Sequence, residues 1–185
     1  MSPDFRYDLP DLPTDLTSQP VIIMPFTPFH FGPSAWLALY SRGKTDVLIF
    51  VLVNVVIDVE PLLVGLYWPC LWAHGYCHNL LIGSLVGFVF GIIAYFGRGI
   101  LEILKRLLNL RYRTSFKKIV LSAILGVWFH IVLDALVESS IHPFFPLQIN
   151  PFFGFIPPSL VIGIFSLCFI PITLIYISNY KKSTF

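Results

Sequence analysis

Four long apolar stretches follow one another along this chain, and polar or proline-rich segments separate them. Each stretch has about the 20 residues that an α-helix needs to cross the hydrocarbon core of a bilayer. We therefore predict four full membrane spans, at Thr45–Tyr67, His74–Gly97, Phe116–Val137 and Ser159–Ser178. Pro171 predicts a kink in the last span, because a proline removes one helical hydrogen bond.

The chain before the first span has two parts. Residues 1–23 are polar, acidic and rich in proline, a composition that predicts a loose tail. Residues 21–40 contain no charged side chain, but three prolines interrupt them, so we predict a short helix only over Pro33–Arg42. The predicted fold class is an all-α polytopic membrane helix bundle, with four full spans and a short N-terminal partial span. Its single transmembrane domain covers residues 24–180.

Basic residues gather at one set of span ends. Residues 98–118 hold most of them, with Glu102 as the single acid, whereas residues 67–74 and 138–158 contain no Lys or Arg. The positive-inside rule therefore predicts that the 98–118 block faces the cytoplasm and that the other two loops lie outside. Within this block, the pattern over Ile100–Leu110 predicts an amphipathic helix at the membrane interface.

Composition indicates a multi-pass protein of the cell membrane. Hydrophobic residues make up 56% of the chain and charged residues only 12%, against roughly 25% charged residues in an ordinary soluble domain. The net charge of +2 is small, and no basic stripe with interleaved aromatic residues is present, which excludes a typical nucleic-acid-binding protein. Membrane lipids are therefore the expected partners, and the oligomeric state stays open.

Two short stretches place metal-type ligands four residues apart. WAHGYCHN contains His74 and His78, and FHIVLD contains His130 and Asp134. Positions i and i+4 share one face of a helix, and a helical His-x-x-x-His pair suits a single metal ion. Glu138 continues the second face at i+8. For the two histidines of the first stretch, hydrogen bonding at the interface is the alternative.

Acids inside the apolar stretches strengthen the metal interpretation. A carboxylate at membrane depth costs several kcal/mol unless it is neutral, paired or bound to a cation. The outer loops offer no Lys or Arg, so Asp134 needs a metal or a shared proton, or must itself be protonated. Asp58 and Glu60 present the same problem, and both reach one site only if Pro61 breaks the helix. Glu60 would be a second ligand, a general base, or a solvated residue at the outer boundary.

Helix rise places these groups in one layer of the membrane. At 1.5 Å per residue, Asp58 lies about 20 Å from the preceding basic turn and Asp134 lies roughly 24 Å from the end of the basic block. His30 lies at a similar depth, and all of these groups fall in the outer half of a core that is roughly 30 Å thick. The predicted metal site therefore comprises His30, Asp58, His74, His78, His130 and Asp134.

Histidines and carboxylates without a cysteine pattern suit zinc or a similar divalent ion in a hydrolytic site, with one or two ions bound. A bound ion would activate water, and Glu60 or Glu138 would accept its proton. We predict a membrane-embedded metal-dependent hydrolase that acts on a lipid or lipid-linked phosphoester or ester. A metal or proton transporter, and a non-catalytic protein whose metal joins its helices, are the alternatives.

The blocks TPFHFGP, NVVIDVEP, HGYCHN, GVWFHIVLDAL and HPFFPL occur in this order within residues 24–155. Their order and spacing resemble the membrane-bound metal-dependent hydrolases, also described as LexA-binding, inner-membrane-associated hydrolases. The resemblance implies that the six residues named above are the metal-site positions and that Glu60 is the second acid. Two positions depart from the family pattern: Ile57 stands where a proline is expected, and Asn79 stands where Ser or Thr is common.

Overall fold

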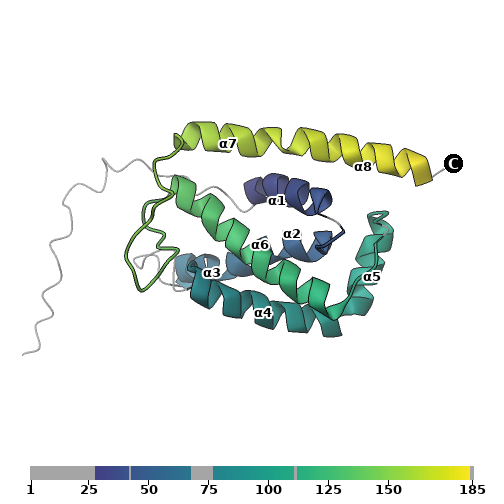
Figure 1. The fold of residues 1–185 in the computed structure, drawn as a ribbon, viewed down its shortest axis with the longest axis horizontal. Helices are drawn as coiled ribbons and strands as arrows, with labels where there is room; N and C mark the ends of the chain where they lie inside the picture. The colour runs from purple at the N-terminus through teal and green to yellow at the C-terminus, as the bar shows by residue number, and fades with distance from the viewer. Residues whose placement is uncertain (1–27, 42, 68–76, 111, 184–185) are drawn as a thin grey trace, which may run out of the picture.

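The computed structural model describes residues 28–41, 43–67, 77–110 and 112–183, and all regular structure within these ranges is α-helical. Eight helices occur in them: α1 (Pro28–Tyr40), α2 (Val47–Ile57), α3 (Val59–Tyr67), α4 (Leu80–Phe96), α5 (Arg98–Leu107), α6 (Phe116–Val137), α7 (Pro158–Leu167) and α8 (Phe169–Ser183). Helix α6 packs against α4 and α2, α1 lies between α2 and the α7–α8 pair, and α7 also packs on the end of α6 (Figure 1). The all-helical prediction is confirmed for these residues.

The membrane-spanning helices are fewer than the sequence predicts. Among the described residues, two stretches are helical, long and apolar enough to cross a membrane, at Phe116–Val137 and Ser159–Ser178. Both match predicted spans residue for residue. A third span is added if α4 and α5, which meet at an 81° bend, are counted together. The structure thus agrees with a helical membrane protein, but the prediction of four full spans is too high.

Two breaks have the same cause. The predicted span Thr45–Tyr67 divides into α2 and α3 at Asp58, three residues before Pro61. The last span divides into α7 and α8 at Cys168, three residues before Pro171. In both cases the proline lacks the N–H group that would bond the carbonyl four residues earlier, so the helical ladder is interrupted at that point. The interruption lies inside the stretch Ser159–Ser178, which still counts as one span by length and composition.

Two helix starts differ from the prediction. Helix α1 begins at Pro28 rather than Pro33, because a proline is well suited to the first helical position, where no N–H bond is needed. His30 therefore lies on a helix. Helix α4 begins only at Leu80, because Asn79 has an extended backbone and its side chain accepts a hydrogen bond from the Ile82 N–H group.

Glycines bring α4 and α6 close together. Gly83, Gly87 and Gly91 lie four residues apart on α4 and are all buried. A Cβ atom on Gly87 would lie 2.9 Å from the Ile124 Cα and 3.0 Å from the Ala123 carbonyl oxygen. The backbones of the two helices therefore touch, as small residues allow in membrane bundles. This contact holds α6, which carries two of the predicted ligands, against the start of α4.

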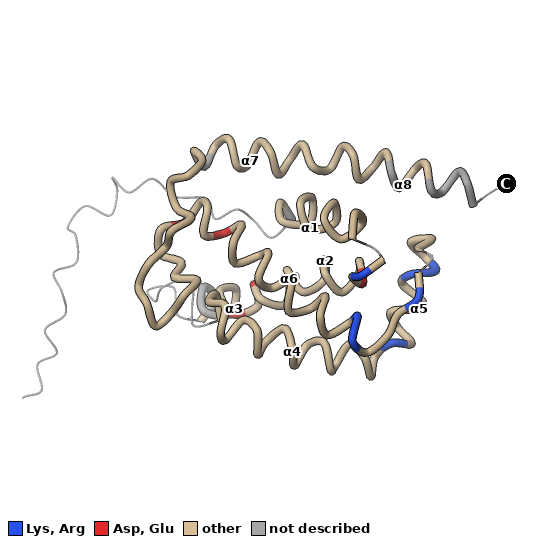
Figure 2. Tube along the Cα trace, viewed as in Figure 1, with Lys and Arg blue, Asp and Glu red and all other residues tan. Residues whose placement is uncertain are grey.

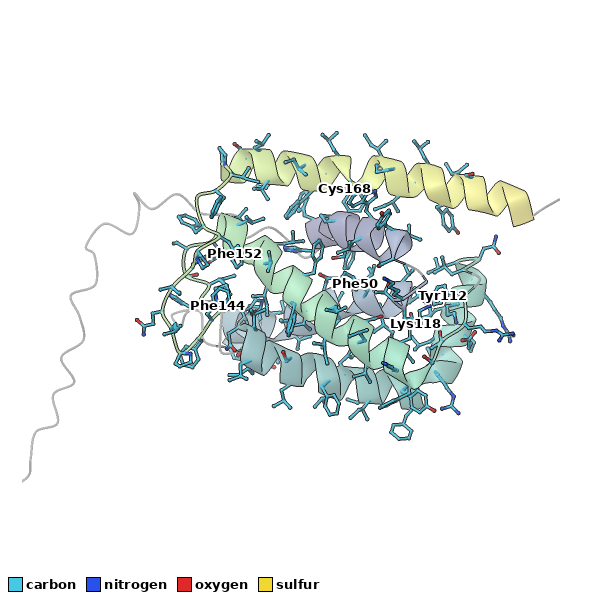
Figure 3. All side chains as sticks on the ribbon, viewed as in Figure 1. Phe50, Tyr112, Lys118, Phe144, Phe152 and Cys168 are labelled. Atoms are coloured by element: carbon cyan, nitrogen blue, oxygen red, sulfur yellow. The ribbon has the colours of Figure 1, made fainter. Side chains whose placement is uncertain are left out.

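The two ends of the bundle differ in chemistry. Most of the Lys and Arg residues gather at α5 and at the adjoining start of α6 (Figure 2). Tyr112 and Lys118 lie at this basic end, whereas Phe144 and Phe152 lie at the opposite end, in the loop that follows α6 (Figure 3). Helix α6 connects the two ends, so His130 and Asp134 lie far from the basic residues that precede this helix.

Candidate metal centre

Four potential metal ligands from three segments meet inside the bundle. Asp58 lies at the break between α2 and α3, and His78 lies in the turn before α4. His130 and Asp134 lie one helical turn apart on α6. One ligand atom from each of these four residues lies within 4.8 Å of the other three. The structure therefore contains a group of Asp and His residues that could hold a metal ion.

The spacing within this group suits a small divalent ion. His130 Nε2 lies 3.0 Å from Asp58 Oδ1 and 3.0 Å from Asp134 Oδ2. His78 Nε2 lies 3.5 Å from the same Asp58 oxygen and 3.7 Å from the same Asp134 oxygen. The ligand atoms of a tetrahedral zinc ion, each about 2.0–2.1 Å from the metal, are roughly 3.3 Å apart. The four observed separations lie on both sides of that value.

Asn54 fixes the orientation of the His130 ring. The Asn54 amide nitrogen donates to the carbonyl oxygens of Phe50 and Val51, at 3.0 Å each, so Oδ1 is the remaining acceptor. His130 Nδ1 lies 3.2 Å from this Oδ1 and therefore carries the proton that it donates. In the neutral ring, Nε2 then has a lone pair directed toward two carboxylates, and among the described residues it has no hydrogen-bond partner. A positive charge, from a second proton or a metal ion, is required at this point.

Asp134 uses both of its carboxylate oxygens. While Oδ2 faces His130 and His78, Oδ1 lies 2.8 Å from His30 Nε2. Every ion-pair partner of Asp134 within the described ranges is a histidine. The His30 ring lies 4.4 Å from the His130 ring, centroid to centroid. His30 thus lies beside the group of four and holds the Asp134 carboxylate from the α1 side.

Glu60 lies at the edge of the group. Its Oε2 accepts a hydrogen bond of 2.8 Å from the Cys77 N–H and lies 4.0 Å from His78 Nδ1. With the helix broken at Asp58, Glu60 lies close to His78, but it is not among the four grouped residues. Burial, together with the hydrogen bond to Glu60 and its charge, raises the pKa of the Cys77 thiol to about 11.

One side of the group is open and the other is closed. The side chains of His78, His130 and Asp134 are nearly inaccessible to solvent. The side chains of Asp58 and Glu60 are 21% and 24% exposed. Solvent therefore reaches the group at Asp58 and Glu60, on the side of the α2–α3 break, whereas the ligands on α6 are buried.

The other predicted residues have different positions. His74 lies outside the described residues. His78 precedes α4, so the prediction that it lies on a helical face is wrong, because Asn79 starts the helix after it. Glu138 ends α6 with an extended backbone, and its carboxylate accepts a 2.6 Å hydrogen bond from Ser140. It therefore does not continue the helical face and is not among the four grouped residues.

The sequence analysis missed one contributor to the centre. Ser34 is fully buried, and its hydroxyl donates to Asn54 Oδ1 at 3.2 Å. It therefore completes the hydrogen bonds that orient Asn54 and, through it, His130. The signal in the sequence is weak: Ser34 follows His30 by four residues, which places both on one face once α1 is known to be helical.

Comparisons with models of known protein families, with curated proteins and with solved structures found no match for this chain. The chemistry of the centre therefore rests on the residues of this chain alone.

Proposed function

We propose that this chain is a membrane-embedded, metal-dependent hydrolase of a lipid or lipid-linked phosphoester or ester, with its site on the non-cytoplasmic side. The observation that carries this proposal is the open edge of the Asp and His group. Asp58, one of the four grouped ligands, and the neighbouring Glu60 are partly exposed, whereas the other three ligands are buried. A purely structural metal site is usually closed on all sides, whereas a catalytic one keeps a position for water or substrate.

The proposed ligands are Asp58, His78, His130 and Asp134, a donor set that suits zinc. When bound, a divalent ion would supply an activated water and polarise a phosphoryl or carbonyl oxygen. Glu60 lies next to the open edge, where its carboxylate can accept the proton of that water. His30 and Asn54 hold the buried ligands Asp134 and His130 in position.

The surroundings of the site favour a lipid substrate. Asp134 lies near the end of α6, one of the helices that are long and apolar enough to span a membrane. Exposed apolar side chains surround this end: Leu62 and Leu63 on α3, and Leu147, Phe153 and Phe155 in the loop after α6. The ester linkages of a lipid lie at the edge of the hydrocarbon core, at the depth expected for the end of a spanning helix.

The same structure argues against a transporter. A path for ions from the site to the basic end would have to cross the packed middle of the bundle. Among the described residues, that region is filled by buried apolar side chains, namely Ile49, Val53, Ala123 and Val127. A charge would cross such a layer only at high cost.

The test is an activity screen on the purified full chain in detergent. Metal-free and zinc-reloaded samples are assayed on a panel of lipid phosphoesters and carboxylic esters. We expect hydrolysis of one class only after reloading. Asp134→Asn should lose both metal and activity, whereas Glu60→Gln should keep the metal and lose activity by about 100-fold or more, as for a general base. Full activity in Glu60→Gln would overturn the assigned proton acceptor, and no activity on any substrate would overturn the hydrolase.

A further inference from the structure

Helix α5 lies across the direction of α4. The two helices meet at Gly97 with a bend of 81°. If α4 runs along the membrane normal, α5 lies close to the plane of the membrane surface. Its position is built into the fold, because Leu101 and Lys105 on its inner side are buried in the protein.

The outer surface of α5 has two chemically distinct sides. At 100° per residue, Ile100, Ile103 and Leu107 share one side of the helix, and these side chains are 66%, 58% and 73% exposed. Arg106 is exposed on the neighbouring side, whereas Arg98, also exposed, lies at the first residue of the helix and by angle close to Lys105. An exposed apolar side bordered by a cation is typical of a helix that lies in the membrane interface.

Both described acids at this end have partners within the protein, Asp46 as a buried group and Glu102 as an exposed one. Asp46 is buried and accepts hydrogen bonds from the Tyr112 hydroxyl at 2.9 Å and from the Thr114 hydroxyl at 2.8 Å. Lys105 Nζ lies 2.6 Å from Glu102 Oε1 and 2.8 Å from Thr114 Oγ1. Neither carboxylate forms an ion pair with the exposed cations of this end.

Among the described residues of α5 and of the segment that leads into α6, four cations are exposed: Arg98, Arg106, Arg113 and Lys117. Within the described ranges, none of them forms an ion pair with a carboxylate. Together with the exposed side of α5 they form a surface that we call the basic face. It combines apolar side chains with positive charge that no acid of the described chain neutralises.

We propose that the basic face binds the headgroups of anionic phospholipids, with Ile100, Ile103 and Leu107 inserted among the acyl chains. Charge complementarity selects this occupant: several cations beside an apolar helical side match a phosphate-bearing lipid surface. The face lies at the opposite end of α6 from Asp134, roughly 24 Å away by helix rise. The proposal is therefore independent of the chemistry at the metal centre.

The experiment compares two lipids that differ in headgroup charge. The full chain in a neutral detergent is titrated with phosphatidylglycerol or with phosphatidylcholine of the same acyl chains, and bound lipid is counted by native mass spectrometry. We expect wild type to bind phosphatidylglycerol on the order of tenfold more tightly, a preference that weakens at high salt. The double variant Arg106→Gln/Lys117→Gln should lose most of this preference, while its binding of phosphatidylcholine stays unchanged.

A matched pair of single variants isolates the face. Lys117→Gln removes a cation of the basic face, and Lys44→Gln removes an exposed cation from the turn between α1 and α2. The preference should fall by roughly fivefold in the first variant and much less in the second. An equal loss of preference in the two variants would mean that lipid binding depends only on the net charge of the chain. That result would overturn the basic face as a binding site. Equal binding of the two lipids by wild type would also overturn it, and would point to an acidic protein partner instead.

Discussion

The chain buries carboxylates at both ends of one apolar bundle, and their surroundings are opposite. Asp46, at the basic end, accepts hydrogen bonds from Tyr112, Thr114 and the Ile49 N–H. Asp134, at the other end, has only histidines as ion-pair partners among the described residues. Donors that carry their own protons satisfy Asp46 within the protein, whereas Asp134 and Asp58 face a ring nitrogen that Asn54 leaves with a lone pair. We infer that Asp46 serves the fold and that the Asp134 end is built to receive a cation.

The largest expected effect is on stability at the basic end. Asp46→Ala leaves two half-buried hydroxyls without their acceptor and removes the N-cap of α2, at roughly 1 kcal/mol or more for each lost contact. We expect the free energy of unfolding to fall by about 3 kcal/mol or more. Asp134→Asn in metal-free protein should cost less, because the amide keeps the shape of the side chain and His130 can release the second proton that balanced the carboxylate. Unfolding in mixed micelles with a chelator present measures both, and a larger loss in Asp134→Asn would reverse the comparison.

Metal addition should separate the two ends. An ion that binds only the folded chain stabilises it by about 2.7 kcal/mol at a free concentration 100 times its Kd. Wild type should gain this increment with zinc and lose it with a chelator. A milder variant at the basic end, Thr114→Val, should show the same gain, and Asp134→Asn should show none. If Thr114→Val also lost the response, the two ends would not be separate sites.

The middle of the bundle joins the two ends. A Cβ atom on Gly126 of α6 would lie 2.5 Å from Val53 Cγ1 and 2.9 Å from the Phe50 carbonyl oxygen, so α2 must move away. We expect Gly126→Ala to lower the free energy of unfolding by about 1–3 kcal/mol and to weaken zinc binding, since Asp58 follows α2. Gly163→Ala is the control, because a Cβ atom there meets nothing within 4 Å. Normal zinc affinity in a destabilised Gly126→Ala protein would show that the ends are uncoupled.

The smallest expected effect is a change in thiol reactivity. Burial and Glu60 raise the pKa of Cys77 from 9.0 to about 11. In a Cys70→Ser/Cys168→Ser background, its alkylation should be slow near neutral pH and should accelerate until the pH approaches 11. Glu60→Gln removes the nearby negative charge, which lowers the thiol pKa and speeds alkylation at a given pH. An unchanged pH profile in Glu60→Gln would contradict the contact between Glu60 and Cys77.

The features that could be predicted from the sequence are those that depend on a single segment or on the lack of a basic partner. Long apolar periodicity located Phe116–Val137 and Ser159–Ser178, because spanning length is a property of a single segment. Buried acids without basic partners indicated Asp58 and Asp134 as members of one group. Pro61 indicated a possible helix break near Asp58. The sequence did not show that this break would leave α2 and α3 too short to count as a full span.

The remaining features depend on contacts between distant segments. Asn79, a residue type that favours helix caps, ends the turn that carries His78, but the predicted span began before it, at His74. Ser34 reaches Asn54 only when α1 packs on α2. Asp46 finds Tyr112 and Thr114, more than sixty positions later in the chain, through the packing of α2 against the segment before α6. Such pairs have no periodicity and could not be read from the sequence alone.

Elemental analysis of the purified full chain tests directly whether the group of Asp58, His78, His130 and Asp134 binds a metal ion. Wild type is compared with the double variant His78→Ala/Asp134→Ala, and His142→Ala, a histidine outside the group of four, serves as the control. We expect about one or two equivalents of a divalent metal in wild type, the same content in His142→Ala and none in the double variant. If wild type binds no metal after reconstitution, or if the double variant binds as much as wild type, the group is not a metal centre.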